Sequence, residues 1–291
     1  MTTWQTAVEI PVQPWFADHC FNGRVVLPAV ESMLLLAAEV AGTFPEIDIR
    51  IMEDVRFAKF LEIPAGSSRV AGLIEYRRDG QGSLLAKLLS RVRFKAATRL
   101  KEHGEILFHP GATGGRLDPE MVPEPLPDPL AEVSAEEVYR ELVPFGPAYH
   151  TLRETLCLSE KSAWGKLKAP PLPVMEEARG IIGSPFPLDG AFHAACVLGQ
   201  RSADFVPFPA GFARRLIIKP TQPGGSYLTR VDLLSQTREE LIFDLTIFDH
   251  HGQVYEVVTG VRMRDVSGGT IKPPDWLKRL SKDPRHPETQ A

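Results

Sequence analysis

Two groups of residues, far apart in the chain, have types and spacing that suit proton transfer. The first is His19, which is followed by Gly23 and Pro28. An imidazole titrates near neutral pH, so it can remove a proton from a carbon beside a carbonyl group. The glycine would let a ligand approach the backbone, and a helix that starts at the proline would offer unpaired N–H groups to that carbonyl. The alternative is a capping or core histidine in a glycine turn.

The second group is Asp189 with His193, four residues apart at the start of an apolar stretch. On a helix this spacing places both side chains on one face. A carboxyl group that is buried from water tends to keep its proton, which a proton donor needs at neutral pH. The alternative is that Asp189 is only a carboxylate that the N-terminal end of the helix dipole favours.

Other polar residues give weaker signals. Cys20 follows His19 directly, and neighbours on an extended chain point to opposite sides, so a Cys/His nucleophilic pair is not expected. His250 and His251 lie in a predicted turn, where solvent exposure is the simpler interpretation. The histidines show no spacing typical of a metal site, so we expect no metal. Arg214, Arg215 and Lys219 form a small basic cluster, which we interpret as a solvated face; the alternative is a contact with an acidic carrier protein.

The composition limits the class of protein. The chain has 291 residues, 43% of them hydrophobic and 24% charged, with a formal net charge of −4. These values are typical of a globular chain and give no sign of a nucleic-acid partner. Three cysteines without paired spacing favour reduced thiols and a cytoplasmic location. We expect no membrane span, because no run of about 20 uncharged apolar residues occurs, and no secretory signal at the N-terminus.

The elements that must position these residues fall into two blocks. A segment rich in proline, residues 110–133, is predicted to be a linker. It separates an N-terminal unit, residues 1–109, from a C-terminal unit, residues 134–266. Residues 267–291 are expected to form a loosely docked polar tail.

Each block contains one very apolar helix candidate and several strand candidates. The helices are predicted between Pro28 and Gly42 and between Leu188 and Gly199. A capping box at Ser134 to Glu137 predicts a further helix at the start of the second block. Alternating patterns predict hairpins whose strands are residues 68–78 with 84–94 and 240–248 with 253–263. The pattern predicts an α+β fold with two antiparallel sheets, each wrapping a central apolar helix.

The order of three motifs resembles the dehydratase domains of polyketide synthases. These motifs are HxxxGxxxxP at His19, GPAYHTL from Gly146 to Leu152, and DxxxH at Asp189. The likeness runs from about Trp15 to Met263. Domains of this family are double hotdogs, so the resemblance implies that fold here.

The resemblance also assigns roles to residues. It implies that His19 is the base and Asp189 the acid, with His193 supporting the acid. Gly23 and Pro28 would lie near the thioester carbonyl, where helix N–H groups stabilise enolate charge. Phe145, Gly146 and Pro147 stand where the family usually has Tyr-Gly-Pro, and Ser184-Pro185 stands where it usually has His-Pro. Both departures concern the substrate pocket rather than the acid and the base.

The implied activity is dehydration of a 3-hydroxyacyl thioester, carried on an acyl carrier protein, to the 2,3-enoyl thioester. No cofactor is expected, and the implied assembly is a homodimer. One base and one acid at a thioester also support aldol cyclisation or a double-bond shift, so these remain alternatives. A non-catalytic acyl-binding hotdog is a further alternative from a different class.

Overall fold

The computed structural model describes residues 2–94, 97–111, 129–174, 178 and 180–280. In the first half, the chain forms β1 (Thr2–Pro11), β2 (Cys20–Phe21), β3 (Arg24–Val25), α1 (Ala29–Thr43), β4 (Ile47–Phe57), β5 (Arg69–Arg78), β6 (Leu84–Phe94) and β7 (Ala97–Pro110). In the second half it forms β8 (Ala131–Ser134), α2 (Ala135–Glu137), β9 (Leu152–Leu158), β10 (Ser162–Lys168), α4 (Phe186–Ser202), β11 (Phe208–Ile217), β12 (Ser226–Gln236), β13 (Glu240–Phe248), β14 (Val254–Arg264) and α5 (Asp275–Arg279). Short helical turns also occur, among them η1 (Pro14–Asp18), η4 (Val138–Leu142) and η5 (Pro147–Tyr149).

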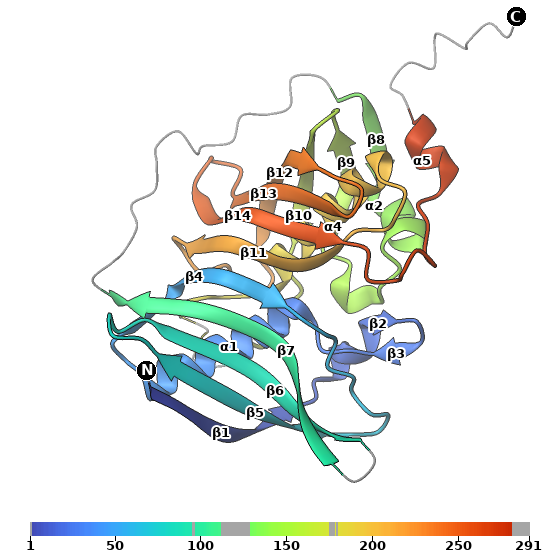
Figure 1. Ribbon diagram of the computed structural model, residues 1–291. Coiled ribbons are helices and arrows are strands. Elements are labelled where there is room, and N and C mark those ends of the chain that lie inside the picture. The colour runs from blue at the N-terminus through green and yellow to red at the C-terminus, as the bar shows by residue number, and fades with distance from the viewer. Residues whose placement is uncertain (1, 95–96, 112–128, 175–177, 179, 281–291) are drawn as a thin grey trace, which may run out of the picture.

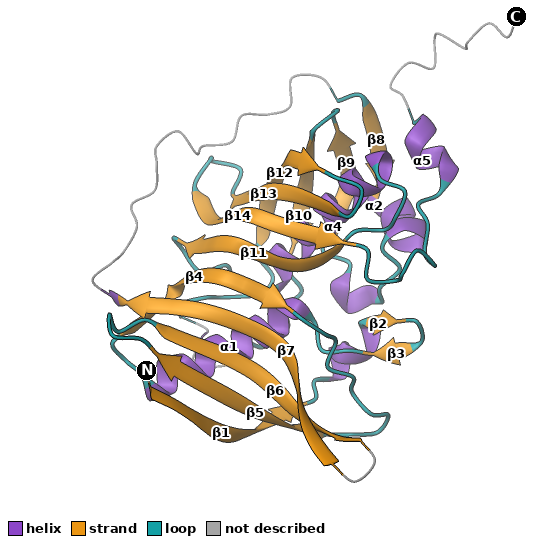
Figure 2. Ribbon diagram, in the orientation of Figure 1, coloured by secondary structure: helices purple, strands orange, loops and turns teal. Residues whose placement is uncertain are grey.

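The first half is an antiparallel sheet curled around α1. Its strands follow the order β1-β5-β6-β7-β4, and Figure 2 shows α1 running along one face of them. Nearly every residue of α1 from Val30 to Val40 is buried, as a helix that is apolar all round requires. Pro28 is the N-cap of this helix, and the helix continues one residue beyond the expected end at Gly42.

The second half repeats this arrangement around α4. Its strands follow the order β11-β14-β13-β12-β10-β9-β8, and α4 is buried from Phe186 to Gln200. The expected capping box is confirmed, because the Ser134 hydroxyl accepts from the Glu137 backbone N–H while the Glu137 carboxylate accepts from the Ser134 N–H. The two expected hairpins are confirmed as well, with β6 and β13 at the predicted limits.

The two sheets join edge to edge into one sheet of twelve strands. β4 of the first half pairs antiparallel with β11 of the second, and Figure 1 shows the two strands side by side at the middle of the molecule. The sequence predicts two sheets, one around each helix, and this seam joins them into one. Since hydrogen bonds of the backbone cross it, neither half presents a free edge there.

The segments outside the two units differ in part from expectation. Most of the predicted linker, residues 112–128, lies outside the described residues, but residues 131–133 belong to β8 and pair with β9. The expected polar tail begins at residue 267, yet the structure places α5 in it, with Leu277 fully buried. Residues 281–291 lie outside the described part of the chain.

The interpretation of the basic cluster as a solvated face is wrong for Arg215, whereas Lys219 is exposed and Arg214 is half-buried. Arg215 is buried and donates from Nε and Nη2 to Oε2 of Glu256, at 3.0 and 2.7 Å. Its Nη1 atom lies 3.9 Å from the sulfur of Met52 on β4. Arg215 therefore belongs to a buried ion pair at the seam. His250 and His251 are exposed in the β13–β14 turn, as expected.

Candidate active site

His19 lies at the end of the short helical turn η1, buried between the two halves. Its Nδ1 is 3.1 Å from the carbonyl oxygen of Val26, so Nδ1–H donates and Nε2 carries the lone pair. The ring stacks on Phe145, with centroids 4.3 Å apart, and meets the edge of Tyr149 at 5.2 Å. Burial lowers the pKa of His19 from 6.5 to about 4, although the nearby charge of Asp189 acts in the opposite direction. The imidazole is therefore neutral at neutral pH and able to accept a proton.

Asp18 fixes the segment that carries Phe145. The Gly146 N–H donates to the Asp18 carbonyl at 2.7 Å, and the Ala148 N–H donates to the Asp18 carboxylate at 2.8 Å. A Cβ on residue 146 would lie 2.5 Å from the same carboxylate, so only glycine allows this approach. Pro147 then starts the η5 turn. The contact ties the second half directly to the residue beside His19.

Asp189 lies in the first turn of α4, and its side chain is buried. Its Oδ2 atom is 3.1 Å from Nε2 of His193, but the angle between the groups is not that of a hydrogen bond. Nδ1 of His193 lies 3.3 Å from the hydroxyl of Tyr139, which also accepts from the Leu152 N–H at 2.7 Å. Tyr139 is held in turn by stacking on His150, with centroids 4.1 Å apart. His193 is thus anchored on one side while its other nitrogen lies beside the carboxyl group.

One cavity of about 560 Å³ reaches both groups. His19, Asp189, His193 and Phe145 all line it, and Ala29 at the start of α1 lines it as well. This volume is within the range of small-molecule sites. The first N–H groups of a helix have no partner within the helix, so α1 offers donors at this wall.

The other predicted site residues lie outside the lining. Gly23 and Asn22, with φ of 74° and 49°, form the tight turn between β2 and β3, and Gly23 is exposed. Among the described residues, Asn22 lines the cavity. Gly23, Pro28, Gly146 and Pro147 do not. Pro28 caps α1, and Gly146 and Pro147 position Phe145 as described above. These residues therefore set the backbone around the cavity and do not line it.

Sequence reasoning missed a buried acid beside the site. Glu31, in the first turn of α1, accepts a hydrogen bond from Trp15 Nε1 at 3.1 Å. Burial, against the hydrogen bond from Trp15 and with a contribution from the charge of Asp189, raises the pKa of Glu31 to about 7. The one feature of the sequence that could have identified Glu31 is its position as a charged residue in an otherwise apolar predicted helix. Asp18 and Tyr139 were missed too, because their partners lie far away in the sequence.

Neither a metal site nor a membrane-spanning helix is found among the described residues. No group of three or more metal-ligating side chains is close enough to hold an ion there. No helix in that part of the chain is both long and apolar enough to cross a membrane.

Comparison with known proteins identifies the architecture as that of polyketide dehydratase domains. The dehydratase domain of a trans-AT polyketide synthase from Brevibacillus brevis superimposes with a TM-score of 0.68 at 18% identity, over 91% of this chain and 94% of that one. The dehydratase domain from the CurJ module of the curacin synthase also gives 0.68, at 19% identity over 90% and 94%. The bifunctional dehydratase-cyclase domain of ambruticin biosynthesis gives 0.63, at 20% identity over 90% and 91%. The fold is therefore a double hotdog.

Sequence comparison gives the family. A model of the polyketide synthase dehydratase N-terminal domain matches residues 117–270, more than half of the chain. Polyketide synthase ThaG of Burkholderia thailandensis is 26% identical over 210 residues, which is 69% of this chain and 4% of ThaG. This chain belongs to the polyketide synthase dehydratase family.

Proposed function

We propose that this chain dehydrates a 3-hydroxyacyl thioester, delivered on an acyl carrier protein, to the 2,3-enoyl thioester. The observation that carries the proposal is that His19 and Asp189, one from each half of the molecule, line the same cavity, and that the charge of Asp189 acts on the pKa of His19. A neutral imidazole and a carboxyl group at one cavity are the base and acid that this elimination needs. Family membership supports the same reaction.

In the proposed reaction, Nε2 of His19 takes the proton from C2 of the substrate. The electron pair forms the C2–C3 double bond as the C3–O bond breaks, and the carboxyl group of Asp189 gives a proton to the departing hydroxyl, which leaves as water. Enolate charge on the thioester oxygen would be stabilised by the N–H groups at the start of α1, whose Ala29 faces the cavity. The chemistry consumes no redox equivalent and calls for no cofactor.

The remaining predicted residues would contact the substrate or position His19 and Asp189. Phe145 and His193 line the cavity and would contact the substrate, whereas Gly146 and Pro147 would hold Phe145 against His19. Gly23 and Pro28 would shape the hairpin and the helix start on the side of the thioester. The cytoplasmic location and the homodimer stay predictions from the sequence.

Hydration of a crotonyl thioester, the reverse reaction, tests the proposal. We expect His19→Ala and Asp189→Asn each to lower turnover by roughly 10²- to 10⁴-fold, the usual effect of losing a positioned proton-transfer group. The double variant should lose little more than either single one. The matched control is His109→Gln, since His109 pairs with Glu53 on the sheet and does not line the cavity.

Three outcomes separate the alternatives. Full activity of Asp189→Asn would show that another group is the acid. A native chain that releases a cyclised or double-bond-shifted product, rather than water and the enoyl thioester, would identify the alternative chemistry on the same pair. A native chain that binds acyl thioesters but converts none would establish the non-catalytic alternative. Circular dichroism of each variant shows whether the fold is retained.

A further inference from the structure

β6 and β7 continue past the rest of the sheet as a two-stranded ribbon, residues 90–94 and 97–101. The pairing of β6 with β5 ends at Leu89, and that of β7 with β4 ends at Gly104. Within the ribbon, the two strands pair only with each other among the residues that the structure describes. Figure 1 shows the ribbon at the lower right of the molecule. A two-stranded ribbon has no core of its own, so its side chains are available to another molecule.

The ribbon is strongly basic in a chain that is acidic overall. It contains four basic residues and no acidic one. The chain has a formal net charge of −4, so a ribbon of +4 leaves −8 for all the other residues. Arg91, Arg93 and Arg99 are exposed, and so are two apolar residues of the ribbon, Val92 at 41% and Leu100 at 48%. Exposed cations beside exposed apolar side chains suit an acidic protein partner, which the charges attract and the apolar contacts hold.

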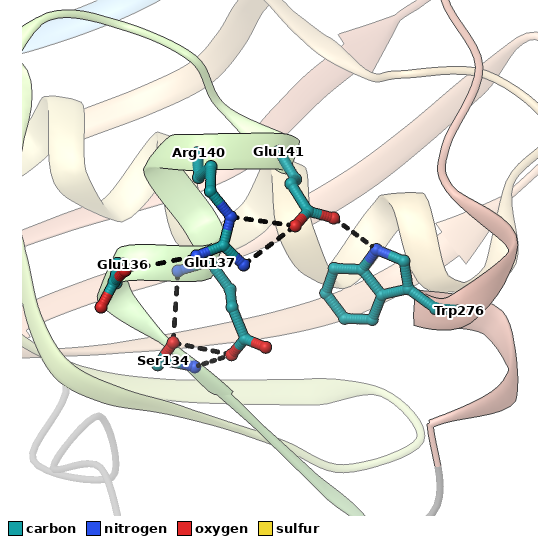
Figure 3. A network of polar contacts seen from close by, with 6 residues as sticks. All are labelled: Ser134, Glu136, Glu137, Arg140, Glu141 and Trp276. Atoms are coloured by element: carbon teal, nitrogen blue, oxygen red, sulfur yellow. Dashed lines mark hydrogen bonds and ion pairs between the residues drawn. The ribbon is translucent and has the colours of Figure 1, made fainter.

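Cations elsewhere on the molecule are often matched by carboxylates. Figure 3 shows one such place, where Arg140 binds both Glu136 and Glu141. In contrast, Arg91 and Arg93 form no ion pair with any residue that the structure describes, and the ribbon has no carboxylate of its own. The charge of these arginines is therefore not neutralised locally and can act on a partner.

The base of the ribbon lies at the cavity described above. Leu88, just before the ribbon in β6, and Lys101, at its end in β7, both line this cavity. Nζ of Lys101 donates to the Phe60 carbonyl at 3.3 Å. The ring centroids of Phe60 and Phe21 are 4.9 Å apart, and Phe21 follows His19 by two residues. A molecule bound to the ribbon would therefore lie beside the segment that carries the proposed base.

The cavity reaches the surface on this side of the molecule. Asn22, Ala58 and Lys59 line it and are exposed. The position of Lys59 is fixed by His103 of β7, whose Nδ1–H donates to the Lys59 carbonyl at 2.9 Å. A group tethered to a partner on the ribbon could therefore enter the cavity beside these residues.

The two faces of the ribbon differ in their relation to the cavity. Residues opposite each other in an antiparallel pair share a face, as do residues two apart in one strand. Lys101 is opposite Ser90, and Arg99 is opposite Val92, so these four residues share one face. Because Lys101 lines the cavity, this face is continuous with the cavity wall. We call it the cavity face.

We propose that an acyl carrier protein docks on the cavity face of the ribbon, where Arg99 and Lys101 bind its acidic residues and Val92 packs against it. This inference rests on the proposed function, because it assumes that the substrate arrives on such a carrier. The charge of −8 on the rest of the chain repels an acidic protein, so the ribbon would steer it to the cavity. A nucleic acid or an anionic membrane would meet the same cations, but neither presents an acyl thioester to the adjoining cavity.

The first test compares one acyl group with and without a carrier. It measures kcat/KM for hydration of a crotonyl group on a free-standing acyl carrier protein of fatty acid synthesis and on N-acetylcysteamine. Arg99→Glu should lower the value for the carrier-borne substrate at least about tenfold, because steering by charge raises association rates by about 10- to 10³-fold. The value for the small thioester should not change, since Arg99 does not line the cavity.

The matched control for this test is Arg153→Glu. Arg153 is exposed on β9 in the second half, so the substitution makes the same change of charge away from the ribbon. It should leave both values of kcat/KM unchanged. Circular dichroism shows whether each variant keeps its fold. Should Arg99→Glu lose the fold, Val92→Glu places a negative charge on the same face and replaces it.

The second test establishes which face is used. The double variant Arg91→Glu with Arg93→Glu reverses the charge of the opposite face. At 0.3 M salt the Debye length is about 5–6 Å, so attraction over longer distances is screened while direct contacts persist. Arg99→Glu should then keep most of its effect on the carrier-borne substrate, and the double variant should be close to the native chain. A larger effect of the double variant would overturn the cavity face as the docking surface.

A binding measurement separates this inference from the proposed reaction. Calorimetry with the same carrier protein bearing no acyl group reports docking without turnover. Binding that is weakened in Arg99→Glu but not in Arg153→Glu would support the docking surface even if the native chain hydrated no thioester, in which case only the proposed reaction would fail.

Two results would overturn the docking surface. The first is an equal kcat/KM for the carrier-borne substrate in the native chain and Arg99→Glu while the small thioester is hydrated, which would leave the proposed reaction standing. The second is binding of the native chain to phosphatidylserine–phosphatidylcholine vesicles or to duplex DNA but not to the carrier protein, which would assign the ribbon to another acidic partner.

Discussion

At the scale of single residues, the site depends on a histidine held neutral by burial. The Val26 carbonyl fixes the tautomer of His19, and Phe145 covers one face of its ring. Sequence motifs identified His19 and Asp189 because each carries a recognisable spacing, and the structure brings both to one cavity. They could not identify Asp18, whose partners Gly146 and Ala148 are adjacent only once the two halves have assembled.

The first prediction concerns the pH dependence of the proposed hydration. Since burial lowers the pKa of His19 to about 4, protonation should remove the base only in that range. We expect the acid limb of kcat/KM to lie near pH 4 rather than near the ordinary histidine value of about 6.5. The measurement is the rate of crotonyl thioester hydration from pH 3.5 to 8, with circular dichroism to establish that the chain stays folded. A half-maximal point near pH 6.5 would show that His19 titrates as if it were exposed.

The second prediction is that Gly146→Ala damages the site without touching substrate. The new Cβ would collide with the Asp18 carboxylate, so the segment that carries Phe145 must move away from His19. Phe145 packs against the His19 ring, so its movement lets that ring shift as well. A shift of the proposed base by about 1 Å can cost roughly 10²-fold in turnover, and we expect a loss of that order. The loss of free energy of unfolding should be smaller, about 1–3 kcal/mol, as for other overpacked sites.

A second glycine gives the control for this experiment. Gly42 lies within α1, and a Cβ built there meets nothing within 4 Å. Gly42→Ala should therefore raise the free energy of unfolding by about 0.5–1 kcal/mol and leave turnover unchanged. Equal turnover in Gly146→Ala and Gly42→Ala would mean that the Asp18 contact does not position His19.

At the scale of elements, the sequence predicted best where one face of a strand is consistently apolar. β13 begins and ends as predicted, because its buried residues alternate with half-buried ones along nearly its whole length. β6 also has the predicted limits, and burial alternates in it from Leu84 to Leu88. β8 was placed inside the linker, since four residues are too few to show a period. The sequence did not predict α5, because a helix of five residues is too short to show a period, although Leu277 is buried and Trp276 packs against the core.

The third prediction concerns Glu31 in α1. Its folded-state pKa of about 7 lies above the ordinary value of 4.5, so the folded chain binds the proton more tightly than the unfolded chain does. The resulting stabilisation is fully present below pH 4.5 and is lost as the pH rises through about 7. Glu31→Gln should remove this loss and raise the free energy of unfolding at pH 8 by on the order of 3 kcal/mol relative to its effect at pH 4.5.

Urea denaturation of the native chain and of Glu31→Gln at pH 4.5, 6 and 8 measures this difference. His19 contributes with the opposite sign, because its lowered pKa destabilises the fold as the pH falls from 6.5 toward 4. The comparison must therefore be made between the two proteins at each pH, which cancels the histidine contribution. Parallel curves for the two proteins would show that Glu31 is ionised normally in the folded chain.

At the scale of the whole molecule, the site exists because two similar units share one sheet. His19 belongs to the first unit and Asp189 to the second, and β4 and β11 hold the units in register. No local pattern could predict this seam, because β4 and β11 are far apart in the chain. Nothing in the sequence of either strand indicates which strand it pairs with. The same reason explains the error at Arg215, whose charge suggested solvent until Glu256 and the sheet covered it.

The last prediction tests the buried ion pair at this seam. Glu256 is fully buried and its second carboxylate oxygen has no hydrogen-bond partner among the described residues, so Arg215 is its main compensation. Arg215→Met should lower the free energy of unfolding by about 3–5 kcal/mol, because it leaves a buried carboxyl group without its partner. The double variant with Glu256→Met should recover most of that loss, since two apolar side chains of similar volume replace the pair. Urea denaturation followed by circular dichroism measures both variants and the single Glu256→Met variant as a thermodynamic cycle. Additive losses in the double variant would mean that the two residues stabilise the seam independently, and that the pair is not what joins β11 to β14 beside β4.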